Sequence, residues 1–281
     1  MNSNTSTSDP FVPAPKPEYF WHPDPTDPDA AGIDTAATIW RYMDLAKFLS
    51  LMSRKELYFA RLDKLGDRFE GSMPKLHAAM RAEMFKGARQ LTPLRPGDLD
   101  ELQSARLQVQ STLVSCWHLN GVESAAMWAA YSSRTQGIAI SSTVGRLVGC
   151  FPTHEGGPAR VSPGADGWLP RLFVRLALVK YIDYQHDQPS ARTTAAWKRK
   201  SFEHERELRA VVADTSIHHW PRRTRWHLGD GVPIDVTNLI DRVFVAPNAE
   251  PWFKEVVLSA VKAYGYQFEV VQSDLNQDPI Y

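Results

Sequence analysis

The stretch TIWRYMDLAKFLSLMSRKELYFA, residues 38–60, decides the fold of this chain. Its β-branched and aromatic beginning, Thr38 to Tyr42, predicts a strand, and Asp44 is suited to cap a helix that starts just after it. Residues 56–60 predict a second strand, so a strand, a helix and a strand follow one another within about 25 residues. The helix is predicted from apolar residues at amphipathic spacing, namely Leu45, Phe48, Leu49 and Met52.

The chain outside this stretch continues to alternate between strand and helix patterns, which predicts an α+β protein with a mixed, mainly antiparallel sheet and flanking helices. A basic helix is expected over 193–204. A last helix is expected to turn one apolar face to the sheet, and that face holds Phe253, Val256, Val257, Ala260, Val261 and Tyr264. Strands are predicted at 112–117, 137–141, 172–184, 207–213, 243–246 and 268–271, and a short helix at 124–131.

The domain organisation follows from where proline and glycine gather. Residues 1–34 contain seven prolines within the first 30 positions and predict a disordered arm, in which Tyr19 to Trp21 favour a segment that packs back on the body. Residues 35–275 form one α+β domain, and 276–281 are a tail. A helical insertion at about 75–110 is expected to be two helices, because Pro93, Pro96 and Gly97 interrupt it.

Composition narrows the classes of protein. The chain has 281 residues, a formal net charge of zero and only two cysteines. It therefore lacks the overall positive charge that would draw it to nucleic acid or to an acidic membrane, and a disulfide framework is not expected. No run of about 18 apolar residues suggests a membrane-spanning helix, and we expect a cytoplasmic protein.

The first candidate site is the loop from Arg61 to Gly71, which carries several carboxylates around one phenylalanine. Asp67 and Glu70 are suited to orient a ribose or to hold a metal ion. The alternative is structural: Asp67 caps the helix that follows Pro74, or it forms an Asx turn.

The second candidate site is the run Glu205-Arg206-Glu207-Leu208-Arg209. Period two along a strand places Glu205, Glu207 and Arg209 on one face. Two carboxylates beside a guanidinium can serve acid/base chemistry or stabilise a cation. The alternative is a surface strand with cross-strand salt bridges.

Aromatic and basic residues give weaker signals. Trp117, Trp128 and Tyr131 can line a wall for a nucleobase or a nicotinamide, although core packing is favoured for them. Cys116 is predicted to be a buried structural thiol, and the histidines have no zinc-ligand spacing. The segment 218–227 mixes aromatics with Arg222, Arg223 and Arg225, which is typical of single-stranded nucleic-acid grooves and also of solvated loops.

Several short motifs fall in the order seen in one bacterial family. They are Arg41-Tyr42, Leu57-Tyr58-Phe59 running into Asp67-x-Phe69-Glu70-Gly71, Ser115-Cys116-Trp117, Met127-Trp128-x-x-Tyr131 with Gly137, and Glu205-x-Glu207-x-Arg209. On these motifs the chain, over about 35–275, resembles the uncharacterised family called domain of unknown function 2971. The resemblance implies no particular reaction.

More distantly, the early strand, helix and strand with a late Glu-bearing strand look like ADP-ribosyltransferases, including the type that modifies DNA. This likeness implies NAD as co-substrate, with Arg41 against its ribose or phosphate and Tyr58 and Trp128 near the nicotinamide. It implies that Glu207 stabilises the oxocarbenium ion and that Glu205 assists the acceptor. Asp67, Glu70, Tyr131 and Arg209 complete the expected nucleotide-binding set.

Two alternatives come from other classes of protein. In a metal-dependent nuclease or hydrolase, the carboxylates Asp67, Glu70, Glu205 and Glu207 would bind Mg²⁺. In a non-catalytic binding module of phage defence or stress response, the arginines at 222, 223 and 225 would meet nucleic acid and the carboxylates would be structural. A transferase needs Glu207, Arg41 and an aromatic side chain to converge on one cleft, whereas a nuclease needs its carboxylates within metal-bridging distance.

Overall fold

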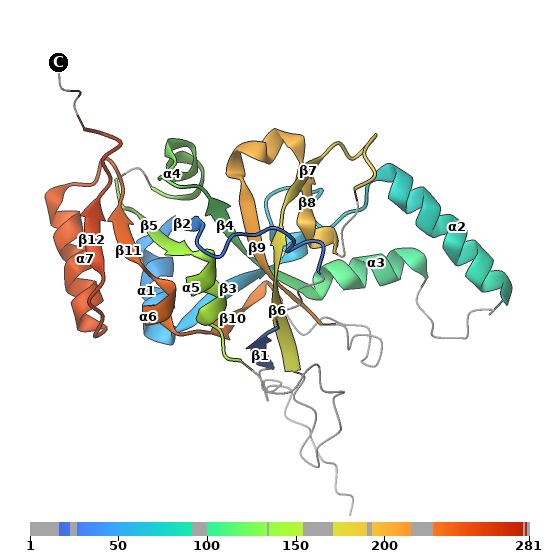
Figure 1. Ribbon diagram of the computed structural model, residues 1–281, viewed down its shortest axis with the longest axis horizontal. Coiled ribbons are helices and arrows are strands. Elements are labelled where there is room, and N and C mark those ends of the chain that lie inside the picture. The colour runs from blue at the N-terminus through green and yellow to red at the C-terminus, as the bar shows by residue number, and fades with distance from the viewer. Residues whose placement is uncertain are drawn as a thin grey trace, which may run out of the picture.

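The computed structural model describes residues 17–22, 27–91, 100–133, 135–153, 171–189, 193–214, 227–277 and 279. Its centre is one large, twisted sheet, with α7 beyond one edge and α2 and α3 extending beyond the other (Figure 1). The sheet is mixed and mostly antiparallel, which confirms the predicted α+β class. None of the helices in the described ranges has the length and apolar character that a membrane span needs.

The predicted strand, helix and strand are present as β2 (Thr38–Asp44), α1 (Leu45–Arg54) and β3 (Glu56–Arg61). The Asp44 carboxylate caps α1 by accepting a hydrogen bond of 2.8 Å from the Lys47 backbone amide. The helix ends at Lys55, which has a left-handed φ of 54°. Phe48, Leu51 and Met52 are buried against the sheet, so the amphipathic spacing read from the sequence is the packing face.

The large sheet has the strand order β1-β6-β9-β4-β2-β5-β11-β12, and β3 joins it through β4 while β10 pairs with β3. The parallel pairs are β1 with β6 and β11 with β12. The strand bounds are β1 Glu18–Trp21, β4 Thr112–Leu119, β5 Gly137–Thr143, β6 Arg171–Leu178, β9 Glu207–Ala213, β10 Gly229–Pro233, β11 Arg242–Val245 and β12 Glu269–Gln272.

The sheet branches at one edge of β4. β3 pairs with the beginning of this strand, at Leu113 and Val114. β2 pairs with its end, at His118 and Leu119. Residues 115–117 lie between these two pairings, so β2 and β3 diverge from each other alongside β4. On its opposite edge β4 pairs with β9 from Thr112 to His118 without a break.

Helices cover the sheet at several places. α7 (Pro251–Ala263) buries Phe253, Val257 and Val261, whereas Val256 and Tyr264 of the predicted face are exposed by 44% and 43%. The apolar face is therefore narrower than predicted. The shorter helices are α4 (Ala125–Tyr131), α5 (Val144–Gly149) and α6 (Val236–Leu239).

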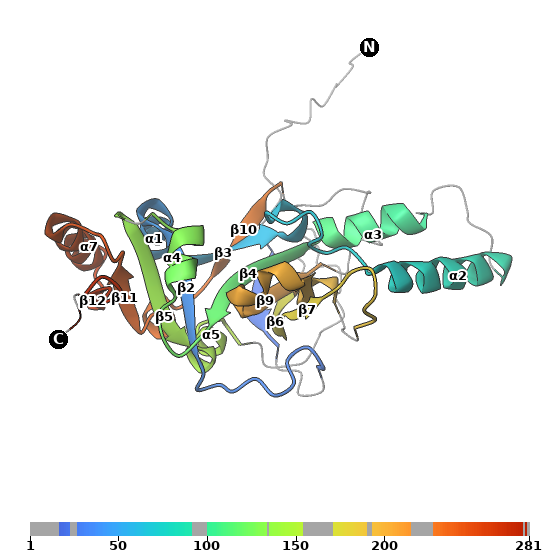
Figure 2. The same cartoon turned by 90° about the horizontal axis from the view of Figure 1, so that it is seen from above.

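The predicted insertion consists of α2 (Lys75–Leu91) and α3 (Glu101–Gln110), as expected for two helices with a break. Both lie beyond the edge of the sheet, side by side in both views (Figure 2). A capping box starts α3, because the Asp100 carboxylate accepts from the Gln103 amide and the Gln103 side chain accepts from the Asp100 amide.

Two predictions about secondary structure are wrong. Residues 18–21 of the predicted disordered arm form β1, which pairs with β6, so the arm is ordered here. The expected packing of Tyr19 to Trp21 on the body is confirmed by the same pairing. The predicted helix over 193–204 is instead a short β8 (Trp197–Arg199) between the 3-10 turns η2 (Thr194–Ala196) and η3 (Lys200–Glu205). β8 pairs with β7 (Lys180–Ile182), and burial of Trp197 and its neighbours outweighs their helix propensity.

Candidate functional site

A cavity of about 850 Å³ opens where β2 and β3 diverge beside β4. It brings together seven of the nine residues singled out in the sequence: Arg41, Tyr58, Asp67, Glu70, Tyr131, Glu205 and Glu207. Arg209 lies behind this lining. Trp128 also lies outside it, in the core, where its indole N–H donates to Glu123 at 2.8 Å. A cavity of about 940 Å³ under α2 and α3 shares only Glu70 with this set.

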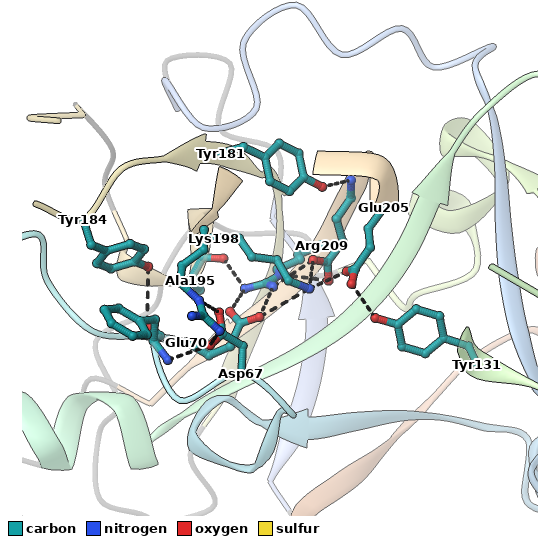
Figure 3. A network of polar contacts seen from close by, with 12 residues as sticks. Asp67, Glu70, Tyr131, Tyr181, Tyr184, Ala195, Lys198, Glu205 and Arg209 are labelled. Carbon is teal, nitrogen blue, oxygen red and sulfur yellow. Dashed lines mark hydrogen bonds and ion pairs between the residues drawn. The ribbon is translucent and has the colours of Figure 1, made fainter. Parts of the chain in front are cut away.

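Arg209 organises the charges at the floor of the cavity (Figure 3). Its side chain is fully buried and donates to Glu70 at 2.9 and 3.0 Å and to Glu207 at 2.8 and 3.0 Å. A further bond of 2.8 Å reaches the Ala195 carbonyl. Burial opposes the charge on Arg209, but Glu207 and Glu70 outweigh it and raise its pKa. One guanidinium therefore holds two carboxylates from distant parts of the chain.

Lys198 is a residue of the charge cluster that the sequence analysis missed. Its ammonium group is buried and contacts Glu205, Glu207 at 3.2 Å and Glu70 at 3.5 Å. Burial alone would lower the pKa of Lys198, but Glu207 and Glu205 outweigh it and raise the pKa. Lys198 is one of three consecutive basic residues, so the local sequence does not distinguish it. It reaches the cluster because β8 is a buried strand.

Glu205 sits between Lys198 and Tyr131. Its Oε2 atom contacts the Lys198 ammonium group, and its Oε1 atom accepts a hydrogen bond of 2.6 Å from the Tyr131 hydroxyl. The backbone carbonyl of Glu205 contacts His118 Nδ1 at 2.6 Å. Glu205 ends η3, and Arg206 takes a left-handed φ of 40° before β9 begins. This turn brings Glu205 and Glu207 to the same lysine although only Glu207 belongs to the strand.

Glu207 is a buried carboxylate with a strongly lowered pKa. Burial opposes its charge, yet Arg209 and Lys198 outweigh burial and lower its pKa to about 2. Its backbone amide also donates to the Tyr181 hydroxyl at 2.7 Å. Burial and the neighbouring Glu207 raise the pKa of the Cys116 thiol well above its usual value. Cys116 is partly exposed and lines the cavity, so its predicted structural role stays a prediction. Because its pKa is about 2, Glu207 is an anion at neutral pH.

The cluster is not electrically balanced when all its groups are charged. Glu70, Glu205 and Glu207 are three anions, and the two cations that contact them are Lys198 and Arg209. This leaves an excess of one negative charge at the floor. In a poorly solvated site such an excess favours a positively charged group in the cavity.

Asp67 belongs to the wall of the cavity and not to a helix cap. Its carboxylate accepts from the Phe69 amide at 3.1 Å, which is the Asx turn of the structural alternative, and it pairs with Arg199 at 2.7 Å. Gly71 ends this loop with a φ of 75°, and a Cβ there would lie 2.7 Å from Val109 Cγ1. The loop that carries Asp67 and Glu70 thus depends on glycine at position 71.

Arg41 lines the cavity on the far side of β4 from Glu207. Its guanidinium donates to the Ser115 hydroxyl and to the Tyr58 carbonyl, the latter at 3.0 Å, and lies 5.6 Å from the centre of the Trp117 ring. No ion pair joins it to a carboxylate in the described part of the chain. Burial lowers the pKa of Arg41 to about 10. The group stays cationic and has N–H donors to spare.

The carboxylates do not form a site suited to a metal ion. The described ranges contain no group of three or more His, Cys, Asp or Glu side chains arranged to hold one. The oxygens of Glu70, Glu205 and Glu207 instead face Lys198 and Arg209, and Asp67 faces Arg199. The magnesium alternative does not fit this arrangement.

The other sequence predictions lie partly beyond the described structure. Arg222, Arg223 and Arg225 fall outside the described residues.

Comparison with known protein families finds no match for the chain, and comparison with curated proteins finds none either.

Proposed function

We propose that the cavity binds NAD or a close relative and that the protein breaks the bond between nicotinamide and ribose, transferring ADP-ribose to an acceptor. The observation that carries this proposal is the division of charge in the cavity. Arg41, a cation without a carboxylate partner in the described ranges, lies on one side of β4. Glu207, an anion in a cluster with excess negative charge, lies on the other side.

NAD matches both ends of such a cavity. Its pyrophosphate is an anion of the kind that guanidinium groups bind through paired hydrogen bonds, which suits Arg41. Its nicotinamide ribose becomes cationic as the glycosidic bond breaks, which suits Glu207. The volume of about 850 Å³ is in the range of cavities that enclose ligands of this size.

The chemical step requires little covalent participation by the protein. The C1–N bond breaks with its electron pair going to nicotinamide, which leaves as a neutral molecule. The ribosyl cation is stabilised by the ionised Glu207 until a nucleophile, water or an acceptor group, forms the new bond at C1. The nucleophile gives its proton to Glu205, whose contact with the half-exposed Tyr131 places it toward the mouth of the cavity.

Aromatic side chains at the opening support the proposal. Tyr58 is exposed by 50% and Tyr131 by 45%, and both line the cavity. Exposed tyrosines at the mouth of a cavity offer flat surfaces for a base. Membership of the family called domain of unknown function 2971 is compatible with this role and stays a prediction.

The test is nicotinamide release from NAD by the purified protein. Glu207→Gln keeps the shape of the side chain but removes its charge, so we expect release to fall by roughly 100-fold or more. Glu203→Gln is the matched control, because Glu203 is an exposed carboxylate of the neighbouring turn η3. Release that survives EDTA would argue against the metal alternative, and release unchanged by Glu207→Gln would contradict the proposal.

A further inference from the structure

His118 is a cavity residue with an unused hydrogen-bonding atom. It lies on β4 directly opposite Glu207 of β9, so the two side chains project from the same face of the sheet. The ring is 3% exposed and belongs to the lining of the cavity. The edge of the Tyr42 ring packs near it, with ring centres 6.3 Å apart.

The contact of His118 with the backbone determines its tautomer. Nδ1 lies 2.6 Å from the Glu205 carbonyl oxygen, which can only accept a hydrogen bond. Nδ1 therefore carries a proton. Burial lowers the pKa of His118, so the ring is neutral at neutral pH and Nε2 carries a bare lone pair.

This lone pair has no partner in the described structure. Nε2 is buried, and no donor among the described residues bonds to it. Buried polar atoms almost always have a partner, so an orphaned acceptor in a cavity wall indicates a donor that the ligand supplies. Nε2 lies across the ring from Nδ1, and hence faces away from the η3 carbonyl of Glu205 that Nδ1 contacts.

We infer that His118 Nε2 accepts a hydrogen bond from an N–H or O–H group of the bound ligand, next to Glu207. This inference rests on the proposed function. In NAD, two kinds of donor flank the bond that breaks: the hydroxyls of the nicotinamide ribose and the carboxamide N–H. His118 is then a residue that positions the ligand against Glu207, and the Nδ1 bond to Glu205 fixes the ring for this role.

Two variants separate this role from a merely structural one. In His118→Asn, the amide nitrogen takes about the place of Nδ1 and retains the bond to Glu205, while no atom replaces Nε2. In His118→Gln, the amide reaches about the place of Nε2, and the bond to Glu205 is lost. The ligand role predicts weaker binding by Asn and near-normal binding by Gln, and a structural role predicts the reverse.

The experiment is calorimetric titration of wild type and both variants with NAD and with ADP-ribose, with melting temperatures measured for each protein. His118→Asn is expected to bind NAD roughly ten-fold more weakly. The same loss with ADP-ribose identifies a ribose hydroxyl as the donor, and a loss with NAD alone identifies the carboxamide. Equal affinity of wild type and His118→Asn for both ligands overturns the inference and leaves the proposed function intact.

A nitrogen NMR measurement on the unliganded protein keeps the two proposals distinguishable. Histidine nitrogen shifts report the tautomer directly, and we expect His118 to be neutral with its proton on Nδ1. A proton on Nε2 overturns the inference whether or not NAD binds. If wild type has the expected tautomer but binds neither ligand, the proposed function is wrong, and the inference falls with it.

Discussion

Replacing Arg209 with methionine tests the charge cluster most severely. The substitution keeps an unbranched apolar side chain but removes the cation that holds Glu70 and Glu207. Lys198 alone would then face three buried carboxylates. Four hydrogen bonds to charged groups would sum to about 6 kcal/mol or more if each were counted separately. Part of that sum is offset by the cost of burying the guanidinium in the wild type.

The expected net loss is therefore the one typical of a broken buried ion pair, about 3–5 kcal/mol in the free energy of unfolding. For a protein of this size it corresponds to a fall in melting temperature of roughly 10 °C. Urea denaturation followed by circular dichroism measures the free energy, and a thermal scan checks it. The control is Arg54→Met, whose guanidinium is 61% exposed and pairs with Glu56 at the surface, with an expected loss below about 1 kcal/mol.

A compensated variant identifies the cause of the loss. When Arg209→Met is combined with Glu70→Gln and Glu207→Gln, no uncompensated charge from this pair remains, so we expect more than half of the lost stability to return. The reasoning is refuted if Arg209→Met costs less than about 1 kcal/mol. It is also refuted if the combined variant is no more stable than Arg209→Met alone, since the loss would then come from packing.

Further predictions concern pH, the loop and the helix cap. Folding lowers the pKa of Glu207 from 4.5 to about 2, so ionised Glu207 contributes about 3 kcal/mol to the free energy of unfolding above pH 4.5. This contribution is lost as the pH falls toward 2. Acid titration of the wild type should show the loss of stability, and Glu207→Gln should lack it. Gly71→Ala should lower the free energy of unfolding in urea by about 2 kcal/mol or more, because φ is 75° and the new Cβ would clash with Val109. An unchanged urea midpoint would contradict this requirement for glycine. Asp44→Ala should cost about 1 kcal/mol through loss of the cap on α1, and Asp44→Asn should retain most of it; equal losses in the two variants would count against capping.

The parts of the fold that sequence analysis predicted are those set by local pattern. The unit from β2 to β3 follows from one amphipathic repeat and one capping residue, and both are visible in the sequence. Glu205, Glu207 and Arg209 were expected on one face of a strand; all three join the cluster, but Glu205 does so from the turn η3 and not from β9. The cation that Glu205 and Glu207 share was not predicted, because Lys198 comes from β8, which pairs with β7.

The failures have a common physical origin. The residues of β1 lie in a proline-rich stretch, and they are ordered by pairing with β6, about 150 positions away. The turns around β8 replace a predicted helix because burial of Trp197 and Lys198 in the tertiary structure outweighs helix propensity. Long-range pairing of this kind leaves no periodic signal in a single sequence.

Equilibrium binding of ADP-ribose to wild type and to Arg41→Met tests the central claim, that the cavity holds a dinucleotide by its two oppositely charged ends. Wild type should bind with measurable heat, and Arg41→Met should bind at least roughly ten-fold more weakly, because the anion loses its guanidinium. A melting curve checks that Arg41→Met is folded at the assay temperature, since the variant also loses the bonds to Ser115 and to the Tyr58 carbonyl. Arg242→Met, an exposed arginine of β11 outside the cavity, should bind as wild type does. Absence of binding by wild type, or equal binding by Arg41→Met, would contradict the account.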